Sequence, residues 1–190
     1  PLRLVGSEMC IRDRSLTYTG ESADGWAGTC FTPSGRSATI EHVQKGALGA
    51  GRDPASLDYQ AGGAVQFGDD LDSLITPRKN GVAFTLGAMG SATSNFYNDA
   101  YSRGGFADEA KHIQQLWLDG KRDLAAAEVP DELVLQTNFL GTVDQVTERI
   151  KAYKDAGVSV LRVAPEGDTP QDRLDALGQI VDIVRALNHR

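Results

Sequence analysis

The residues best suited to bind a small molecule lie in a Gly- and Ser-rich stretch near the middle of the chain. Met89, Gly90 and Ser91 precede Asn95 and Tyr97 there. Glycine lets the backbone approach a ligand closely, and Ser, Asn and Tyr side chains can orient it through hydrogen bonds. Long loops of this kind usually carry function, so we expect these five residues in a substrate pocket. The alternative is a segment that caps a helix and buries its aromatic rings.

A second group of candidates follows the expected strands, because barrel enzymes carry their functional residues on the loops after strands. Gly28 and Thr29 follow the first such strand, and Gly167 follows the last. Arg162 interrupts an apolar strand, where it would either pair with a carboxylate or bind the anionic tail of a cofactor. Trp26 would either stack on a ligand ring or belong to the core.

Other kinds of chemistry find little support in the sequence. The three histidines do not have metal-ligand spacing, so we expect no metal. Cys30 has no neighbouring base that would activate a thiolate, and we expect a buried structural thiol. No glycine fingerprint of the dinucleotide-binding type is present. The catalytic acid or base therefore remains unassigned.

Composition narrows the choice of partners. The chain has 190 residues, a formal net charge of −7 and no basic stripe, which argues against nucleic acid. No apolar run approaches the roughly 20 residues that span a bilayer, which argues against a membrane partner. Two cysteines make no disulfide framework, and we expect a cytoplasmic protein.

The expected strands and helices would hold these candidates in place. Residues 22–30 fit the end of a strand that runs into a loop. Residues 57–67 fit a strand, and the glycines inside it favour close approach of a backbone or a ligand. Residues 158–164 are almost continuously apolar, which is typical of a strand buried on both faces of a parallel sheet. A helical insertion is expected at about residues 70–140, with Pro77 kinking or stopping its first helix.

Several helix boundaries are marked by their capping residues. Thr32 and Pro33 predict the start of a helix, since Thr caps well and a first-turn proline is tolerated. Thr142 and Gln145 have the spacing of a capping box, and Gly157 is placed to end that helix.

The order of elements implies parallel βαβ units in an α/β fold. About three strands cannot close a (β/α)8 barrel, which takes eight strands and about 250 residues. The chain is therefore either a small open α/β domain or an incomplete barrel. Residues 4–13 match the translation of a transposase-based sequencing adapter, and we expect residues 1–14 to be an artefact. This favours the incomplete barrel, with residues 15–190 as the C-terminal portion of one domain.

An ordered series of segments resembles the luciferase-like monooxygenase superfamily, and within it the coenzyme F-420-dependent oxidoreductases of actinobacterial type. The segments are GESADGW (20–26), FTP (31–33), AGRDPASLD (50–58), GAMGSATSNFYND (87–99), VPDELV (129–134) and YKDAGVSVLRVAP (153–165). The resemblance implies the C-terminal part of a TIM barrel that binds a deazaflavin at the carboxyl ends of its strands.

The same resemblance implies hydride transfer between reduced coenzyme F-420 and a small organic substrate. Gly28, Thr29, Arg162 and Gly167 are then the expected cofactor contacts, with Trp26 joining the residues of the substrate pocket. FMN is the alternative cofactor, for a monooxygenase reaction, and a non-catalytic α/β binding module is the alternative of another class. In this family much of the cofactor-binding sequence precedes the segment seen here. We therefore expect the chain alone to be inactive. For the full-length protein we expect a homodimer.

Overall fold

One parallel sheet organises the molecule, and the computed structural model describes residues 7–8, 12–91 and 94–189 of it. The strands are β1 (Ser7–Glu8), β2 (Gly25–Ala27), β3 (Asp58–Phe67), β4 (Phe139–Gly141) and β5 (Val160–Pro165). The helices are α1 (Asp13–Ser22), η1 (Pro33–Ala38), α2 (Ile40–Gly49), η2 (Pro54–Ser56), α3 (Leu71–Ala88), α4 (Phe96–Tyr101), η3 (Ser102–Phe106), α5 (Ala107–Leu118), α6 (Arg122–Ala127), α7 (Asp131–Thr137), α8 (Val143–Asp155) and α9 (Pro170–Asn188). Of the segment expected to derive from an adapter, residues 1–6 and 9–11 lie outside the described residues.

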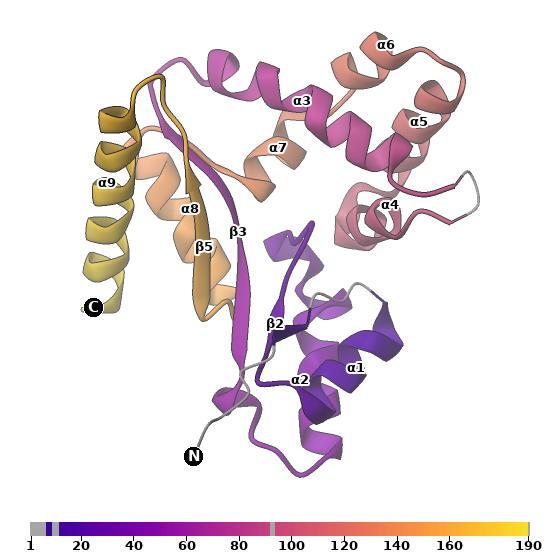
Figure 1. Ribbon diagram of the computed structural model, residues 1–190, viewed down its shortest axis with the longest axis vertical. Coiled ribbons are helices and arrows are strands. Elements are labelled where there is room, and N and C mark those ends of the chain that lie inside the picture. The colour runs from indigo at the N-terminus through magenta and orange to yellow at the C-terminus, as the bar shows by residue number, and fades with distance from the viewer. Residues whose placement is uncertain (1–6, 9–11, 92–93, 190) are drawn as a thin grey trace.

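Strand β3 is the centre of the sheet (Figure 1). One of its edges pairs with β5 from Gln60 to Val65, while the other pairs with β2 at its start and with β4 at its end. Between β2 and β4 the side chain of Asn138 continues the ladder, because its Oδ1 accepts a hydrogen bond from the Ala64 N–H at 3.0 Å.

The glycines inside β3 are required by the close approach of neighbouring backbones, as the sequence indicated. A Cβ atom at Gly62 would lie 1.8 Å from the carbonyl oxygen of Arg162 on β5. A Cβ atom at Gly63 would lie 2.0 Å from the carbonyl oxygen of Thr137. No side chain fits at either position without displacing backbone.

Helices α8 and α9 cover one face of the sheet beside β3 and β5 (Figure 1). The expected capping box forms at the start of α8, where Thr142 and Gln145 bond each other's backbone, and Gly157 follows the helix with a φ of 97°. The apolar stripe of α8, formed by Val146, Ile150 and Tyr153, is buried in the core beneath the sheet.

Helices α3 to α7 form a second layer with a hydrophobic core of their own. Leu86 of α3, Ile113 of α5 and Leu133 of α7 are each completely buried in it. The helices lie above the carboxyl-terminal half of β3 and extend away from the sheet (Figure 1). They occupy residues 71–137, within the range in which a helical insertion was expected.

Two expected helix breaks differ from the structure. Pro77 does not stop or divide α3, which continues to Ala88. The proline removes the donor that the Ser73 carbonyl would use, but both residues are exposed, so water can bond that carbonyl. Conversely, the helix expected from Thr32 is interrupted at Thr39, whose φ of −134° and ψ of −84° separate the 3₁₀ helix η1 from α2.

Strand β5 is less buried than its apolar sequence predicted. The prediction of burial on both faces is wrong, because Arg162 and Ala164 are exposed on the face away from α8 and α9. Within the described residues, the outer edge of β5 has no strand beside it. The sheet also contains two short strands, β1 and β4, that the sequence did not indicate.

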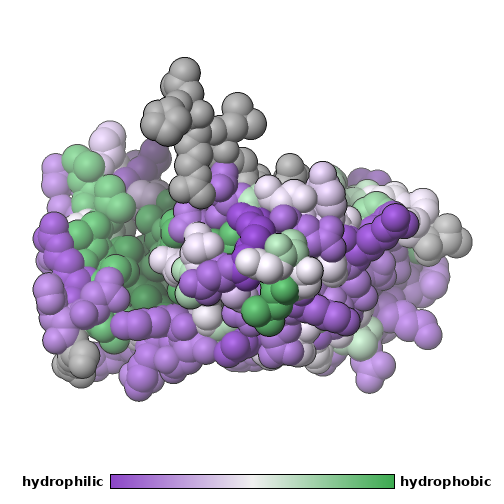
Figure 2. All heavy atoms as spheres, turned by 90° about the horizontal axis from the view of Figure 1, so that it is seen from below, coloured by the Kyte–Doolittle hydropathy of each residue, from purple (hydrophilic) through white to green (hydrophobic). Residues whose placement is uncertain are grey.

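The side of the molecule formed by β5, α8 and α9 exposes apolar side chains. Leu174, Leu177 and Val181 of α9 are 61%, 38% and 37% exposed, respectively. Figure 2 shows hydrophobic surface gathered on the side where β5, α8 and α9 lie in Figure 1.

None of the helices in the described part of the chain has the length and apolar character that a membrane-spanning helix needs.

Candidate functional site

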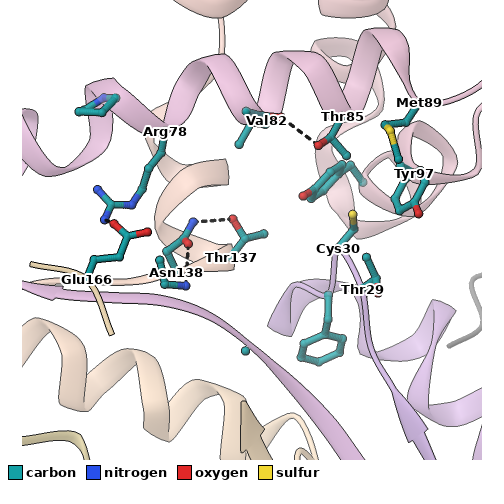
Figure 3. Close-up of a pocket in the computed structure, with 16 residues that line it drawn as sticks. Thr29, Cys30, Arg78, Val82, Thr85, Met89, Tyr97, Thr137, Asn138 and Glu166 are labelled. Carbon is teal, nitrogen blue, oxygen red and sulfur yellow. Dashed lines mark hydrogen bonds and ion pairs between the residues drawn. The ribbon is translucent and has the colours of Figure 1, made fainter. Parts of the chain in front are cut away.

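An open cleft of about 430 Å³ lies between α3 and the face of β3 that points away from α8 and α9. Gly62 and Ala64 line it from β3, so its floor carries no side chain larger than a methyl group. Helix α3 runs along its opposite wall (Figure 3). The cleft has a charged end and a less polar end, which are built from different elements.

Arg78 of α3 and Glu166, which follows β5, point toward each other at the charged end (Figure 3). Arg78 Nη2 forms an ion pair with Glu166 Oε2 and donates a hydrogen bond to Gln66 Oε1 at 2.8 Å. Its Nη1 donates to the carbonyl oxygen of Leu74. The Arg78 side chain is 13% exposed, whereas that of Glu166 is 49% exposed. The arginine is therefore held in place, and the glutamate is the freer partner.

Cys30, Met89 and Tyr97 define the less polar end (Figure 3). Tyr101 lines the cleft beside Cys30. Cys30 adopts the left-handed backbone conformation with a φ of 57°, which is uncommon for a residue other than glycine. Burial raises the pKa of the Cys30 thiol to about 11, and a side-chain hydrogen bond with Tyr101 offsets part of that rise. Burial also raises the pKa of Tyr101 well above its ordinary value. Both groups are thus neutral hydrogen-bonding groups at neutral pH.

The raised pKa predicts slow alkylation of Cys30. In a Cys10→Ser variant, which leaves Cys30 as the single thiol, the rate of reaction with iodoacetamide should rise with a midpoint near pH 11. A free cysteine gives a midpoint of about 8.5. Because the folded-state pKa is raised, the stability contributed by the neutral thiol should be present below pH 9 and decline toward pH 11. A midpoint at or below that of free cysteine would contradict the burial of this thiol.

Three of the expected site residues, Thr29, Met89 and Tyr97, line the cleft. Gly28 and Arg162, both expected to bind a cofactor, contact each other, since Arg162 Nη2 donates a hydrogen bond to the Gly28 carbonyl oxygen at 2.6 Å. Neither of the alternatives foreseen for Arg162 included this backbone partner.

Gly167 lies beside the cleft rather than in it. With Gln66, Asp168 and Arg173 it lines a neighbouring hollow of about 450 Å³, which the cleft meets at Glu166. The loop after β5 therefore separates two polar openings.

Asn95 has a structural position, which matches the alternative that we gave for its segment. Its Oδ1 accepts hydrogen bonds from the N–H groups of Tyr97 and Asn98, which caps α4, and its Nδ2 donates to the Leu86 carbonyl oxygen at 2.7 Å. The side chain is buried, so it holds the end of α3 against the start of α4. Gly90 and Ser91 belong to the turn between these helices and are not among the residues that line the cleft.

Substitution of Asn95 should therefore lower stability. Asn95→Ala removes the cap and the bond to Leu86, and we expect a loss of about 2 kcal/mol in the free energy of unfolding. Asn95→Asp keeps the capping oxygen and should lose less, while Tyr97→Phe should change stability little. Urea denaturation of the three variants, followed by circular dichroism, tests this order. Equal stability of Asn95→Ala and the parent chain would show that the cap is dispensable.

Trp26 lies in the core and is not among the residues that line the cleft. It is 1% exposed and packs edge-on against Phe31, with ring centroids 5.8 Å apart. Its ring also lies beneath Gly28, where a Cβ atom would be 2.5 Å from Trp26 Cη2. The core alternative given for this residue describes its position, and the substrate-pocket alternative does not.

Sequence reasoning missed Arg78, Tyr101 and Asn138 as parts of the cleft. Arg78 belongs to α3 and Tyr101 to α4, and no local motif marks either residue as part of a cleft. Asn138 precedes a strand of three residues that gave no periodic signal. Among the described residues, no group of three or more His, Cys, Asp or Glu could hold a metal ion.

A parallel sheet with covering helices and a cleft against its inner face defines this chain as an α/β protein of the TIM-barrel type. Residues 10–160 match the family model of the luciferase-like monooxygenases, and the chain belongs to that family.

Two relatives in sequence are mycobacterial oxidoreductases. A protein of Mycobacterium tuberculosis assigned as a coenzyme F-420-dependent oxidoreductase is 28% identical over 162 residues, which cover 84% of this chain and 46% of the relative. The phthiodiolone/phenolphthiodiolone dimycocerosates ketoreductase of Mycobacterium kansasii is 30% identical over 154 residues, covering 79% of this chain and 42% of the relative. The chain thus spans slightly less than half the length of these relatives.

Solved structures confirm the predicted barrel-type fold. The coenzyme F-420-dependent tetrahydromethanopterin reductase of Methanopyrus kandleri superposes with a TM-score of 0.68 at 24% identity, over 90% of this chain and 48% of that one. An F-420-dependent secondary alcohol dehydrogenase, in complex with an F-420–acetone adduct, gives a TM-score of 0.61 at 18% identity, over 97% of this chain and 49% of that one.

Proposed function

We propose that this chain is part of an oxidoreductase that transfers a hydride between coenzyme F-420 and a small organic substrate. The observation that carries the proposal is the cleft against the glycine-containing floor of β3, in a family whose matched relatives include proteins named as F-420-dependent. Active sites of barrel enzymes lie toward the carboxyl ends of the strands, and two residues that line this cleft, Thr29 and Glu166, follow β2 and β5.

The residues present fit a planar ring cofactor. Gly62 and Ala64 leave a floor without protruding side chains, against which a flat ring can lie, and the volume falls in the usual range for ligand pockets. Thr29 offers a hydroxyl at one side, while Thr137 and Asn138, whose polar groups bond within the protein, line another side. When bound, the reduced deazaflavin supplies a hydride.

The remaining residues would bind and orient the substrate. Val82 and Met89 contribute apolar surface that excludes water, and Tyr97 can donate a hydrogen bond. Cys30 and Tyr101 keep their protons at neutral pH, so this end of the cleft carries no negative charge that would oppose hydride transfer. We further propose that residues 15–190 belong to one barrel domain, with the α3–α7 layer inserted in it.

Ligand binding to matched variants tests the proposal. Coenzyme F-420 and FMN would each be equilibrated with the chain, and bound ligand would be measured by absorbance after ultrafiltration. We expect F-420 to bind and Ala64→Leu, which fills the floor, to weaken its binding by about tenfold or more. Ala152→Leu, on the outer side of α8, serves as the control and should have no effect. Binding of FMN in preference to F-420 would favour the flavin alternative, and F-420 binding that is insensitive to Ala64→Leu would place the cofactor elsewhere.

A further inference from the structure

Arg78 combines strong burial with an unused hydrogen-bond donor. Its side chain is only 13% exposed, yet it lines the cleft. Its Nη atoms have the partners described above, but its Nε is buried and has no hydrogen-bond partner among the described residues. That nitrogen is shielded from the cleft, so a ligand would reach the guanidinium at Nη2, where Glu166 now binds, and arginine is well suited to binding carboxylate or phosphate groups. The local chemistry at this end of the cleft therefore favours an anion.

Glu166 already supplies one carboxylate to Arg78, and it is poorly held there. Its side chain is 49% exposed and belongs to the loop between β5 and α9, next to Gly167. An ion pair with one exposed partner contributes little to stability, so a ligand carboxylate or phosphate can compete with it. Arg173 lines the hollow on the other side of Glu166, and offers the displaced glutamate a second cation nearby.

Helix α3 extends from this anion position along the whole cleft. Arg78, Val82, Thr85 and Met89 recur at helical spacing and all line the cleft, as Figure 3 shows along the wall. The eleven steps from 78 to 89 correspond to about 16 Å at 1.5 Å per residue. The wall thus changes from a buried cation to apolar side chains over the length of a medium-sized molecule.

We propose that Arg78 binds the anionic group of an elongated amphipathic ligand, whose apolar part lies along α3 toward Val82 and Met89. Glu166 is the internal carboxylate that the ligand replaces. This deepens the proposed function by naming a ligand class for the same cleft. The anion is a carboxylate or phosphate, and it belongs either to the substrate or to the acidic tail of the cofactor.

Three small probes test the proposal on the chain itself, without any cofactor. Octanoate carries both the anionic group and an apolar tail, 1-octanol carries the tail alone, and acetate carries the anion alone. Affinities would be measured by chemical-shift titration, with octanoate kept below its aggregation threshold. We expect octanoate to bind more tightly than either of the others, by about tenfold.

Two variants separate ligand recognition from a purely structural ion pair. Arg78→Gln should lower octanoate affinity by about tenfold and leave octanol affinity unchanged. Glu166→Gln should raise octanoate affinity by about two- to fivefold, because it removes the competing carboxylate. Arg149→Gln is the matched control, since Arg149 is also a largely buried arginine in an ion pair, with Glu132 at 3.6 Å. A weaker octanoate complex in Glu166→Gln, or equal loss of octanoate and octanol in Arg78→Gln, would overturn the proposal.

Comparison with coenzyme F-420 then identifies the source of the anion. If Arg78→Gln weakens F-420 binding as much as octanoate binding, the anion is the tail of the cofactor. If F-420 binding is unchanged, the anion belongs to the substrate. Because the octanoate measurements need no cofactor, failure of F-420 to bind would refute the proposed function and leave the anion position standing. Loss of the octanoate preference in the parent chain would refute the anion position and leave the proposed function standing.

Discussion

Gly62→Ala should abolish the native sheet or come close to doing so. The added methyl group would lie 1.8 Å from the Arg162 carbonyl oxygen, which is backbone of the paired strand β5 and cannot rotate away. The strand must separate from its neighbour or the residue must change its φ of 156°. We expect a loss of about 3 kcal/mol or more in the free energy of unfolding, which is a large share of the stability of a typical domain.

A matched glycine substitution provides the control. Gly178 lies within α9, and a Cβ atom there would have no neighbour within 4 Å. Gly178→Ala should therefore raise stability by about 0.5–1 kcal/mol, because alanine is the better helix former. Urea denaturation followed by circular dichroism would measure both variants. A Gly62→Ala variant as stable as the parent would show that β3 and β5 are not packed as described.

Trp26→Ala should be the most damaging side-chain truncation in the core beneath the sheet. The indole is 1% exposed and contacts Phe31, so its removal leaves a large cavity between β2 and the surrounding elements. Truncation of a buried tryptophan costs about 3–5 kcal/mol. Trp26→Phe keeps much of the volume and should lose less.

The same variants decide between the two roles given to this tryptophan. If Trp26 serves the core, Trp26→Ala lowers the midpoint of urea unfolding strongly. Leu118→Ala, at a side chain that is 50% exposed, should change it by less than about 0.5 kcal/mol. If Trp26 formed part of a ligand pocket, its replacement would weaken ligand binding and leave the unfolding midpoint nearly unchanged.

Features that depend on a few adjacent residues could be predicted from the sequence. Thr142 and Gln145 form their capping box within four residues. The long strand β3 was found from its composition, and its glycines correctly indicated close backbone contact. In each case the stabilising interactions lie within the segment itself, or would form with whichever strand pairs with it.

Features that depend on distant partners could not be predicted in this way. Strand β4 has three residues and exists because it pairs with the end of β3. The continuation of α3 through Pro77 depends on burial of its flanking residues in the second core. Resemblance to a family supplied the barrel-type fold, which about three visible strands could not have specified.

The candidate site was only partly predicted for the same reason. Three residues that line the cleft, Thr29, Met89 and Tyr97, could be predicted from local sequence. Thr29 follows an expected strand, and the other two lie in a long Gly- and Ser-rich stretch. Asn95 also has a polar side chain that could have bound a ligand, but this side chain caps α4. Arg78 lines the cleft only because α3 folds back over β3, and nothing in its immediate sequence indicates that path.

The two separate hydrophobic cores give the chain two regions that can open with different free energies. The cleft is lined by residues of both regions, so any molecule bound there spans the boundary between them. Binding would then link two unfolding equilibria, and hydrogen exchange in α5 and α7 should slow along with that in β3. Every opening that destroys the cleft is then made less favourable by the same amount, RT ln(1 + [L]/Kd), whichever region opens.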